Sequence, residues 1–191
     1  MNKKLGRPRS LETKHSILTA AYELLIEKGF NAITIEGIAQ RAGVSKATIY
    51  KWWPGKAAVV LEGYFEATQL VMPVPDTGCV ADDLLIQVQN LSTFITSPRG
   101  KMITELIGAG QFDSDIATEY RNRFFLPRRS ISRGILSRGI ERGELRKDIE
   151  IERSIDLIFA PLFYRLLLTG DPLDRNYIKG LITDVLKGLR I

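Results

Sequence analysis

The side chains that most often make or break bonds in enzymes are scarce in this chain. Its 191 residues contain one histidine, His15, and one cysteine, Cys79. One residue of each kind cannot build the usual zinc sites, and it excludes most histidine-dependent catalytic arrangements. A single cysteine also excludes a disulfide within the chain. We therefore expect no metal site and no internal disulfide.

Two pairs of carboxylates are the remaining candidates for acid–base chemistry. They are Asp82 with Asp83 and Asp113 with Asp115. Asp82 and Asp113 stand where helices are expected to begin, and such positions are typical of capping residues and helix-dipole partners. His15 has no evident acid–base partner, and no nucleotide-binding loop accompanies these residues. The sequence thus predicts that the protein is not an enzyme and has no cofactor.

The positive charge of the chain lies in its first third. The whole sequence has 27 lysines and arginines against 22 acids, a net charge of +5. Residues 1–56 have ten basic residues against four acids, a net +6, whereas the remainder has a net −1. This asymmetry is typical of a segment that binds nucleic acid, although a basic tail on a solvated helix would look similar.

The composition is that of a globular protein, with 45% hydrophobic and 26% charged residues. The longest apolar run, Leu157–Tyr164, is bracketed by Asp156 and Arg165 and is too short to span a membrane. The N-terminal residues lack the apolar stretch of a secretory signal. We therefore expect a cytoplasmic protein with no membrane partner.

The first third has the pattern of three helices, over residues 10–29, 34–43 and 45–53. Each begins at a residue that favours the N-cap position, namely Ser10, Thr34 and Ser45. Glycine ends the first two helices, and Pro54-Gly55 ends the third. Two short helices joined by a tight glycine-containing turn are a helix-turn-helix.

The third helix is expected to have two different faces. At about 100° per residue, one face carries Ile49 and Trp53, and the other carries Ala47 and Lys51 flanked by Thr48 and Tyr50. Lysine can bind phosphates or guanine edges, a small alanine permits close approach to bases, and hydroxyls can bind phosphate oxygens. The outer face therefore favours a DNA major groove. The alternative is the solvated face of an ordinary three-helix bundle.

The stretch from Ile35 to Lys56 resembles the DNA-binding region of the tetracycline-repressor (TetR) family of bacterial transcriptional regulators. The matching motifs include Ala42-Gly43-Val44-Ser45, followed by Lys46-Ala47-Thr48-Ile49-Tyr50, and the similarity extends from Arg7 to about Tyr64. Trp53 stands where the family often has phenylalanine, and Trp52 where histidine is common. An indole can stack or donate one hydrogen bond but cannot supply charge.

The resemblance implies a set of DNA contacts. It implies base-edge contacts from Lys46, Ala47 and Lys51, DNA-backbone contacts from Thr34, Thr48, Tyr50 and Lys56, and further interface positions at Ser45 and Trp52. Arg7 and Arg9, beside glycine and proline, indicate a flexible arm that can reach the DNA. A disordered solubilising tail is the alternative for that arm.

The remainder of the chain has helical patterns only, near residues 56–70, 82–96, 98–109, 113–126, 128–142, 149–169 and 173–190. The expected fold class is all-α with about ten helices. We predict an N-terminal arm and helix-turn-helix domain at 1–56, a connector helix at 57–76, and a helical domain at 77–191 that binds ligand and dimerises.

Two apolar stripes near the C-terminus are candidates for a dimer interface. They consist of Ile155, Ile158, Leu162 and Leu166, and of Ile178, Leu181, Ile182, Val185, Leu186 and Leu189. Such stripes are more often core than interface. The resemblance implies an interface, because family members pair their last two long helices across a two-fold axis. A two-fold homodimer would bind a palindromic operator in double-stranded DNA.

Aromatic and apolar side chains in the second part of the chain could line a small-molecule pocket. They are Phe94, Met102, Leu106, Phe112, Phe124, Phe125, Phe159 and Phe163. Core packing is the alternative for each. Residues 140–146 and 156–165 also resemble a recurring signature of the family's effector-binding domains, which implies such a pocket. Residues 121–147 have a net charge of +7, which could attract an anionic effector or could be a solvated face.

The predicted function is a ligand-responsive dimeric repressor that a small-molecule effector releases from its operator. The alternative is a DNA-binding regulator or architectural protein without an effector.

Overall fold

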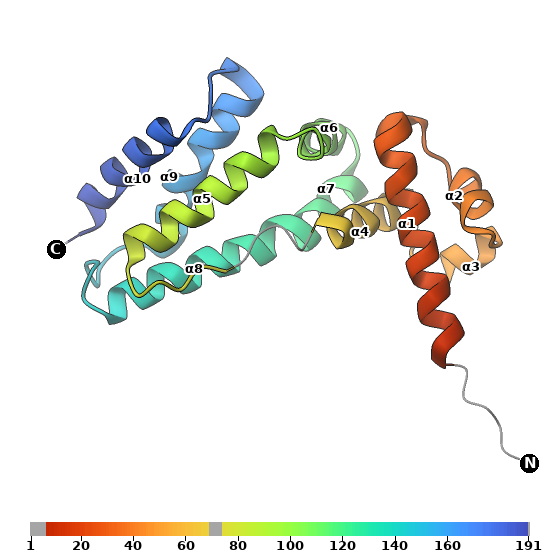
Figure 1. Cartoon of the computed structure of the whole chain (residues 1–191), viewed down its shortest axis with the longest axis horizontal. Coiled ribbons are helices and arrows are strands. Elements are labelled where there is room, and N and C mark those ends of the chain that lie inside the picture. Colours follow the sequence, from red (N-terminus) through yellow and green to blue (C-terminus); the bar gives the residue numbers. More distant parts are fainter. Residues whose placement is uncertain (1–6, 69–73, 191) are drawn as a thin grey trace, which may run out of the picture. The chain divides into compact units, whose positions relative to one another are not determined.

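The computed structural model describes residues 7–68 and 74–190, and the side chains from residue 11 onward. Within these residues all regular structure is helical (Figure 1), so the predicted all-α class is confirmed. The helices are α1 (Arg7–Ala32), α2 (Ile35–Ala42), α3 (Lys46–Tyr50), α4 (Lys56–Thr68), α5 (Val80–Thr96), α6 (Lys101–Gly110), α7 (Ser114–Tyr120), α8 (Leu126–Glu141), α9 (Ile151–Tyr164) and α10 (Arg175–Leu189), with π-helical segments at Arg121–Phe125 and Arg165–Thr169. None of the described helices is both long and apolar enough to cross a membrane.

The chain forms two compact units whose limits differ from the predicted domains. The N-terminal unit contains α1 to α4 together with residues 105–124, and the C-terminal unit contains residues 74–104 and 125–190. Helix α4 packs along α1 and also against α7. The predicted connector helix and a piece of the predicted ligand-binding domain therefore share a core with the helix-turn-helix.

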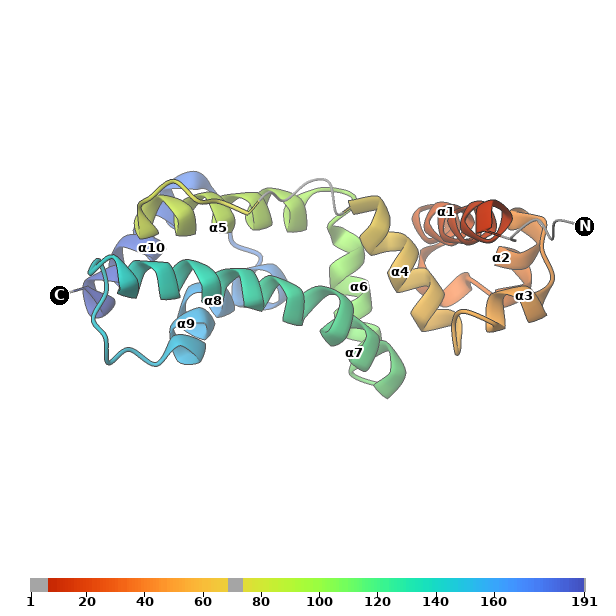
Figure 2. The same ribbon diagram turned by 90° about the horizontal axis from the view of Figure 1, so that it is seen from below.

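In the N-terminal unit, α1 packs against both α2 and α4 (Figure 2). Its core includes Ile17, Ile38, Ile49 and Leu61, all of which are fully buried. Helix α1 begins at Arg7, so the cap predicted at Ser10 is wrong. The helical geometry is interrupted at Gly29 (φ 73°, ψ 163°), as predicted, but helix resumes and reaches Ala32.

The third helix is shorter than the predicted 45–53. Helix α3 ends at Tyr50, and Lys51 and Trp52 form a turn in which the N–H groups of Trp52 and Trp53 donate to the Ile49 carbonyl at 3.0 and 3.1 Å. The physical reason is Pro54, because a residue that precedes proline disfavours the α conformation.

In the C-terminal unit, four helices surround one core. Helix α5 packs against α8 and α10, and α9 packs against the same two helices. The predicted break at Pro127 is wrong, because helical backbone continues from Ser114 through the π-helical segment to Glu141. Pro127 lies directly after the π-helical segment, as the second residue of α8.

Candidate nucleic-acid interface

The two faces predicted for the third helix are confirmed. Ile49 and Trp53 are buried, with 0% and 1% of their surface exposed. Ala47 and Lys51 on the opposite side are exposed. A five-residue helix is too short to be stable alone, so the two buried anchors hold α3 against the unit. The exposed side is consequently presented on a fixed scaffold.

The starts of α2 and α3 and the turn between them are built from local contacts that the sequence predicted. Thr34 Oγ1 accepts a hydrogen bond from the Gly37 N–H at 3.0 Å, and Ser45 Oγ accepts one from the Thr48 N–H at 3.2 Å. Gly43 ends α2 in the left-handed conformation at φ 67°, which L side chains rarely adopt. These contacts fix how α3 leaves α2.

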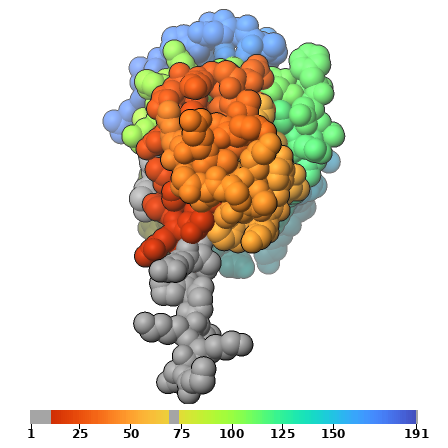
Figure 3. Space-filling view, turned by 90° about the vertical axis from the view of Figure 1, so that its right-hand side faces the viewer, coloured from red at the N-terminus to blue at the C-terminus, as the bar shows by residue number. Residues whose placement is uncertain are grey.

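The outer surface of this turn and helix is polar, basic and aromatic. Lys46, Lys51, Tyr50 and Trp52 are all exposed, Tyr50 by 54% and Trp52 by 38%. Figure 3 shows the side of the N-terminal unit on which α2 and α3 (orange) lie open at the surface. Lysines with exposed aromatic side chains are suited to phosphates and base edges.

The two lysines of this surface differ in their surroundings. The Lys46 Nζ lies 2.6 Å from Glu36 Oε1, and this contact raises the pKa of Lys46 and lowers the pKa of Glu36. Among the residues that the structure describes, no carboxylate forms an ion pair with Lys51. Exposed ion pairs contribute little to stability, so a DNA phosphate can replace Glu36 as the partner of Lys46. Lys51 can bind a phosphate or base without such an exchange.

Lys56 has a structural role that the sequence did not indicate. Its Nζ donates to the Phe30 carbonyl at 3.1 Å and lies 4.4 Å from the centre of the Phe30 ring. Burial lowers the pKa of Lys56, although the charge of Asp113 opposes that shift. This contact ties the start of α4 to the last turn of α1. The DNA-backbone contact of Lys56 stays a prediction.

The predicted flexible arm is wrong for Arg7 and Arg9, because their backbone belongs to the first turn of α1. Their side chains lie outside the described residues, as does the rest of the arm at 1–6. Their DNA contacts stay a prediction.

The eight residues predicted to line an effector pocket are divided between the two units. Leu106, Phe112 and Phe124 belong to the N-terminal unit, and Phe94, Met102, Phe125, Phe159 and Phe163 to the C-terminal unit. The prediction is wrong for Phe112, which is 96% exposed. Phe124 is buried against Phe65 with ring centres 5.1 Å apart, and Leu106 is a fully buried core residue.

A groove in the C-terminal unit has a different lining. It lies between α5 and α10 and has a volume of about 360 Å³. Its walls are Ala81, Asp82, Leu85, Lys179, Ile182, Thr183, Leu186, Lys187 and Arg190. None of the predicted pocket residues contributes to it. Pocket lining by Leu106, by Phe124 and by the five residues of the C-terminal unit stays a prediction.

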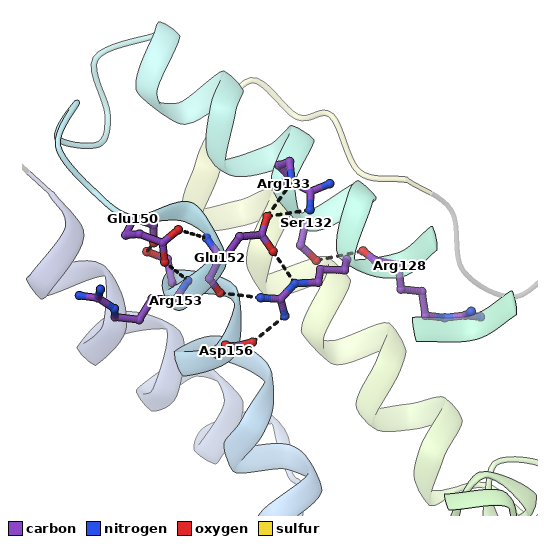
Figure 4. Close-up of polar contacts among 9 residues, drawn as sticks. Arg128, Ser132, Arg133, Glu150, Glu152, Arg153 and Asp156 are labelled. Atoms are coloured by element: carbon purple, nitrogen blue, oxygen red, sulfur yellow. Dashed lines mark hydrogen bonds and ion pairs between the residues drawn. The ribbon is translucent and has the colours of Figure 1, made fainter. Parts of the chain in front are cut away.

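The basic stretch 121–147 is extensively paired with carboxylates of the same chain. Arg129 binds Glu152 and Asp156 of α9, and Arg133 binds Glu152 as well, as Figure 4 shows around the labelled Arg133, Glu152 and Asp156. Further pairs are Arg123 with Glu119, Arg138 with Asp76, Arg142 with Glu144 and Arg146 with Asp148. Arg129 and Arg133 thus join α8 to α9, and other arginines of the stretch pair with nearby carboxylates, which weakens the case for an anionic effector here.

Seven of the ten predicted interface residues are wrong as interface residues. Within a single chain the structure buries Ile155, Ile158, Leu162, Ile178, Ile182, Leu186 and Leu189, each at most 8% exposed. A side chain that is already covered has no surface left for a second copy. Leu166, Leu181 and Val185 are partly exposed and stay a prediction.

Another apolar surface lies on α9 and the π-helical segment that follows it. It consists of Leu157, Tyr164, Leu167 and Leu168, which are 53%, 58%, 40% and 75% exposed. Single exposed leucines are common, but four within twelve residues form a patch. These residues were not predicted from the sequence. They are apolar residues of the same helical run, but they lie beside the predicted stripe rather than on it.

Comparison with known proteins assigns both parts of the chain to one family. Residues 17–62 match the family described as bacterial regulatory proteins, tetR family, and residues 74–185 match the tetracyclin repressor-like C-terminal domain. The chain is 52% identical over 190 residues to the HTH-type transcriptional regulator YdeS of Bacillus subtilis (strain 168), covering 100% of this chain and 96% of YdeS.

Two further proteins agree with this assignment. The chain is 30% identical to the DNA-binding transcriptional repressor TetR of Mycobacteroides abscessus, with 90% of each chain covered. The crystal structure of the TetR family transcription regulator SCO0332 is 39% identical, with a TM-score of 0.80 over 93% of this chain and 98% of that one. The chain therefore belongs to the TetR family of bacterial DNA-binding transcriptional regulators.

Proposed function

We propose that the protein is a cytoplasmic, dimeric repressor that binds a palindromic operator through α3 and is released by a small-molecule effector. The observation that carries the proposal is the exposed face of α3 and the turn after it, with Ala47 and Lys51 outward and Ile49 and Trp53 buried beneath. The Mycobacteroides relative, whose name describes a repressor, supports the sign of regulation. A two-fold dimer would place two such helices about 34 Å apart, one turn of DNA.

In this proposal each side chain of the reading surface has a separate task. Lys51 is free to bind a guanine edge, and Ala47 lets the helix approach the bases. The hydroxyl of Thr34 accepts from the backbone of α2 and still has a proton to donate to a phosphate. An effector must bind the DNA-incompetent state more tightly, and a typical coupling of about 1–3 kcal/mol changes operator affinity about 5–150-fold.

The base-reading role is tested with Lys51→Ala on an operator that the wild-type protein selects from random duplexes. We expect the substitution to weaken operator binding about tenfold or more, because a base contact is lost. Binding to random DNA should weaken much less. Fluorescence anisotropy across salt concentrations measures both. Lys28→Ala is the matched control, because Lys28 is an exposed lysine of α1 in the same unit. Equal losses on both DNAs would rule out base reading by Lys51.

The dimer is tested on the apolar patch of Leu157, Tyr164, Leu167 and Leu168. We expect Leu168→Glu to convert the protein from dimer to monomer in sedimentation velocity, because a carboxylate would have to be buried without a partner. The control is Leu126→Glu on α8, where the side chain is 51% exposed. A Leu168→Glu protein that stays dimeric would show that the copies associate through another surface.

A regulator or architectural protein without an effector is the second candidate. It is favoured by the division of the predicted pocket residues between two units. An architectural protein should bind operator and random DNA equally at each salt concentration. A repressor should prefer its operator throughout.

A further inference from the structure

Four elements of the N-terminal unit meet at one carboxylate, that of Glu62 on α4. Its Oε1 lies 2.7 Å from the Lys14 ammonium of α1. Its Oε2 accepts a hydrogen bond from Trp53 Nε1 at 2.8 Å and lies 2.7 Å from an Arg123 nitrogen. Trp53 and Arg123 are 70 positions apart in the sequence and share this single oxygen.

The Glu62 side chain is largely enclosed, with 19% of its surface exposed. Burial alone would raise its pKa, but the donors of Lys14 and Trp53 and the charge of Arg123 hold the pKa of Glu62 below its usual range. The group is therefore a carboxylate at neutral pH. Charge-assisted hydrogen bonds of this kind are stronger and more directional than neutral ones, so the three partners hold one another in place.

Trp53 connects this carboxylate to the reading surface. Its indole is buried, its backbone N–H donates to the Ile49 carbonyl, and Trp52 packs edge-on against it with ring centres 5.5 Å apart. The exposed Lys51 and Trp52 lie directly before it in the chain. The position of Glu62 Oε2 therefore helps to fix the end of α3 and the turn that follows.

Arg123 connects the same carboxylate to the segment after α6. Its Nε donates to Glu119 of α7 at 2.6 Å, and the adjacent Phe124 stacks on Phe65 of α4. Arg123 lies in the π-helical segment that continues in sequence into α8. A displacement of this segment would act on the oxygen that holds Trp53.

We propose that Glu62 is a positioning residue for DNA reading, through which residues 114–124 set the orientation of α3. The inference rests on the proposed reading role of α3. In this proposal, Arg123 is the residue through which a displacement of that segment reaches α3. Neither Glu62 nor Arg123 contacts the DNA in this proposal.

The test compares Arg123→Gln with Arg121→Gln. Arg121 is exposed, lies two residues away in the same π-helical segment and carries the same charge, so long-range electrostatics change equally. We expect Arg123→Gln to weaken operator binding about two- to thirtyfold relative to Arg121→Gln, the range of such coupling. Backbone hydrogen exchange at Trp52 and Trp53 should accelerate only in Arg123→Gln. Arg123→Lys, which keeps a cation, should recover part of both effects.

A double-variant cycle with Glu62→Gln tests whether the two residues act together. The amide of Glu62→Gln can still accept from Trp53 but forms no ion pair. If Arg123 acts through Glu62, the double variant should bind operator no more weakly than the worse single variant. The inference would be overturned if the losses of operator affinity multiply in the double variant, or if hydrogen exchange at Trp52 and Trp53 is unchanged in Arg123→Gln. An equal loss of affinity for random DNA would also overturn it. A wild-type protein that selects no operator would instead refute the proposed function.

Discussion

Replacing Gly63 with alanine is expected to destabilise the N-terminal unit by about 3 kcal/mol or more. An added Cβ at this position would lie 2.5 Å from the Leu18 carbonyl oxygen, far inside contact distance. The clash is between the backbones of α4 and α1, and Leu18 and Gly63 are both buried. Neither helix can retreat without opening the core between them. Thermal unfolding followed by circular dichroism should show a transition lowered by about 10 °C.

Gly108→Ala is the matched control for this experiment. Gly108 lies in α6, and an added Cβ there would meet nothing within 4 Å. Alanine should stabilise that helix by up to about 1 kcal/mol, since it restricts the unfolded chain and favours helix. The two substitutions are chemically identical and should have opposite signs. A Gly63→Ala protein as stable as Gly108→Ala would contradict the close approach of α1 and α4.

The features that the sequence predicted correctly are those that a few neighbouring residues determine. Thr34 and Ser45 cap helices through N–H groups three residues away, and Gly43 ends α2 through its own backbone. The burial of Ile49 and Trp53 follows from their spacing in one short segment. These local rules were enough to define the candidate reading face.

The features that the sequence did not predict depend on which distant element covers a given face. The periodicity of Ile158 and Ile182 predicted a covered stripe, but it could not distinguish a second copy from the neighbouring helices of the same chain. The contacts of Glu62 come from residues 9, 48 and 61 positions away. Charge counts along residues 121–147 likewise missed the carboxylates of α9 that neutralise Arg129.

Replacing the buried Asp83 with alanine should destabilise the C-terminal unit by about 3 kcal/mol, the lower end for breaking a buried charge pair. Asp83 lies in the first turn of α5 and is 0% exposed. Its Oδ1 accepts from the N–H and the hydroxyl of Thr77, both at 2.7 Å, and Arg138 lies 3.6 Å from Oδ2. The alanine variant would leave these donors partly buried without their acceptor. Arg138 keeps its hydrogen bond to the Pro75 carbonyl at 3.0 Å, which limits the destabilisation.

Asp82→Ala is the matched control, because Asp82 lies in the same first turn and is exposed. Both variants lose the same favourable interaction with the helix dipole, worth about 0.3–1 kcal/mol. The difference between their unfolding free energies in urea therefore isolates the buried contacts of Asp83. Equal destabilisation would mean that the contacts with Thr77 and Arg138 contribute nothing beyond the dipole.

The contribution of Asp83 should also depend on pH in one direction. Burial would raise its pKa, but the hydrogen bonds from Thr77 and the charge of Arg138 lower the pKa of Asp83 below 3.8 in the folded chain. The unfolded chain therefore takes up this proton at a higher pH than the folded chain. The stabilisation is complete above the unfolded pKa and is lost as the pH falls through the folded pKa.

The free-energy gap between wild type and Asp83→Asn should accordingly stay constant from about pH 8 to pH 5 and narrow below about pH 4. Asparagine keeps the size of the side chain but has no carboxylate to titrate, so its curve lacks this one contribution. Asp82→Asn is the matched control, because it removes an exposed carboxylate from the same first turn of α5. A gap that stays constant down to pH 2 would show that protonation of Asp83 is not linked to unfolding. The contacts with Thr77 and Arg138 would then not depend on the charge of the carboxylate.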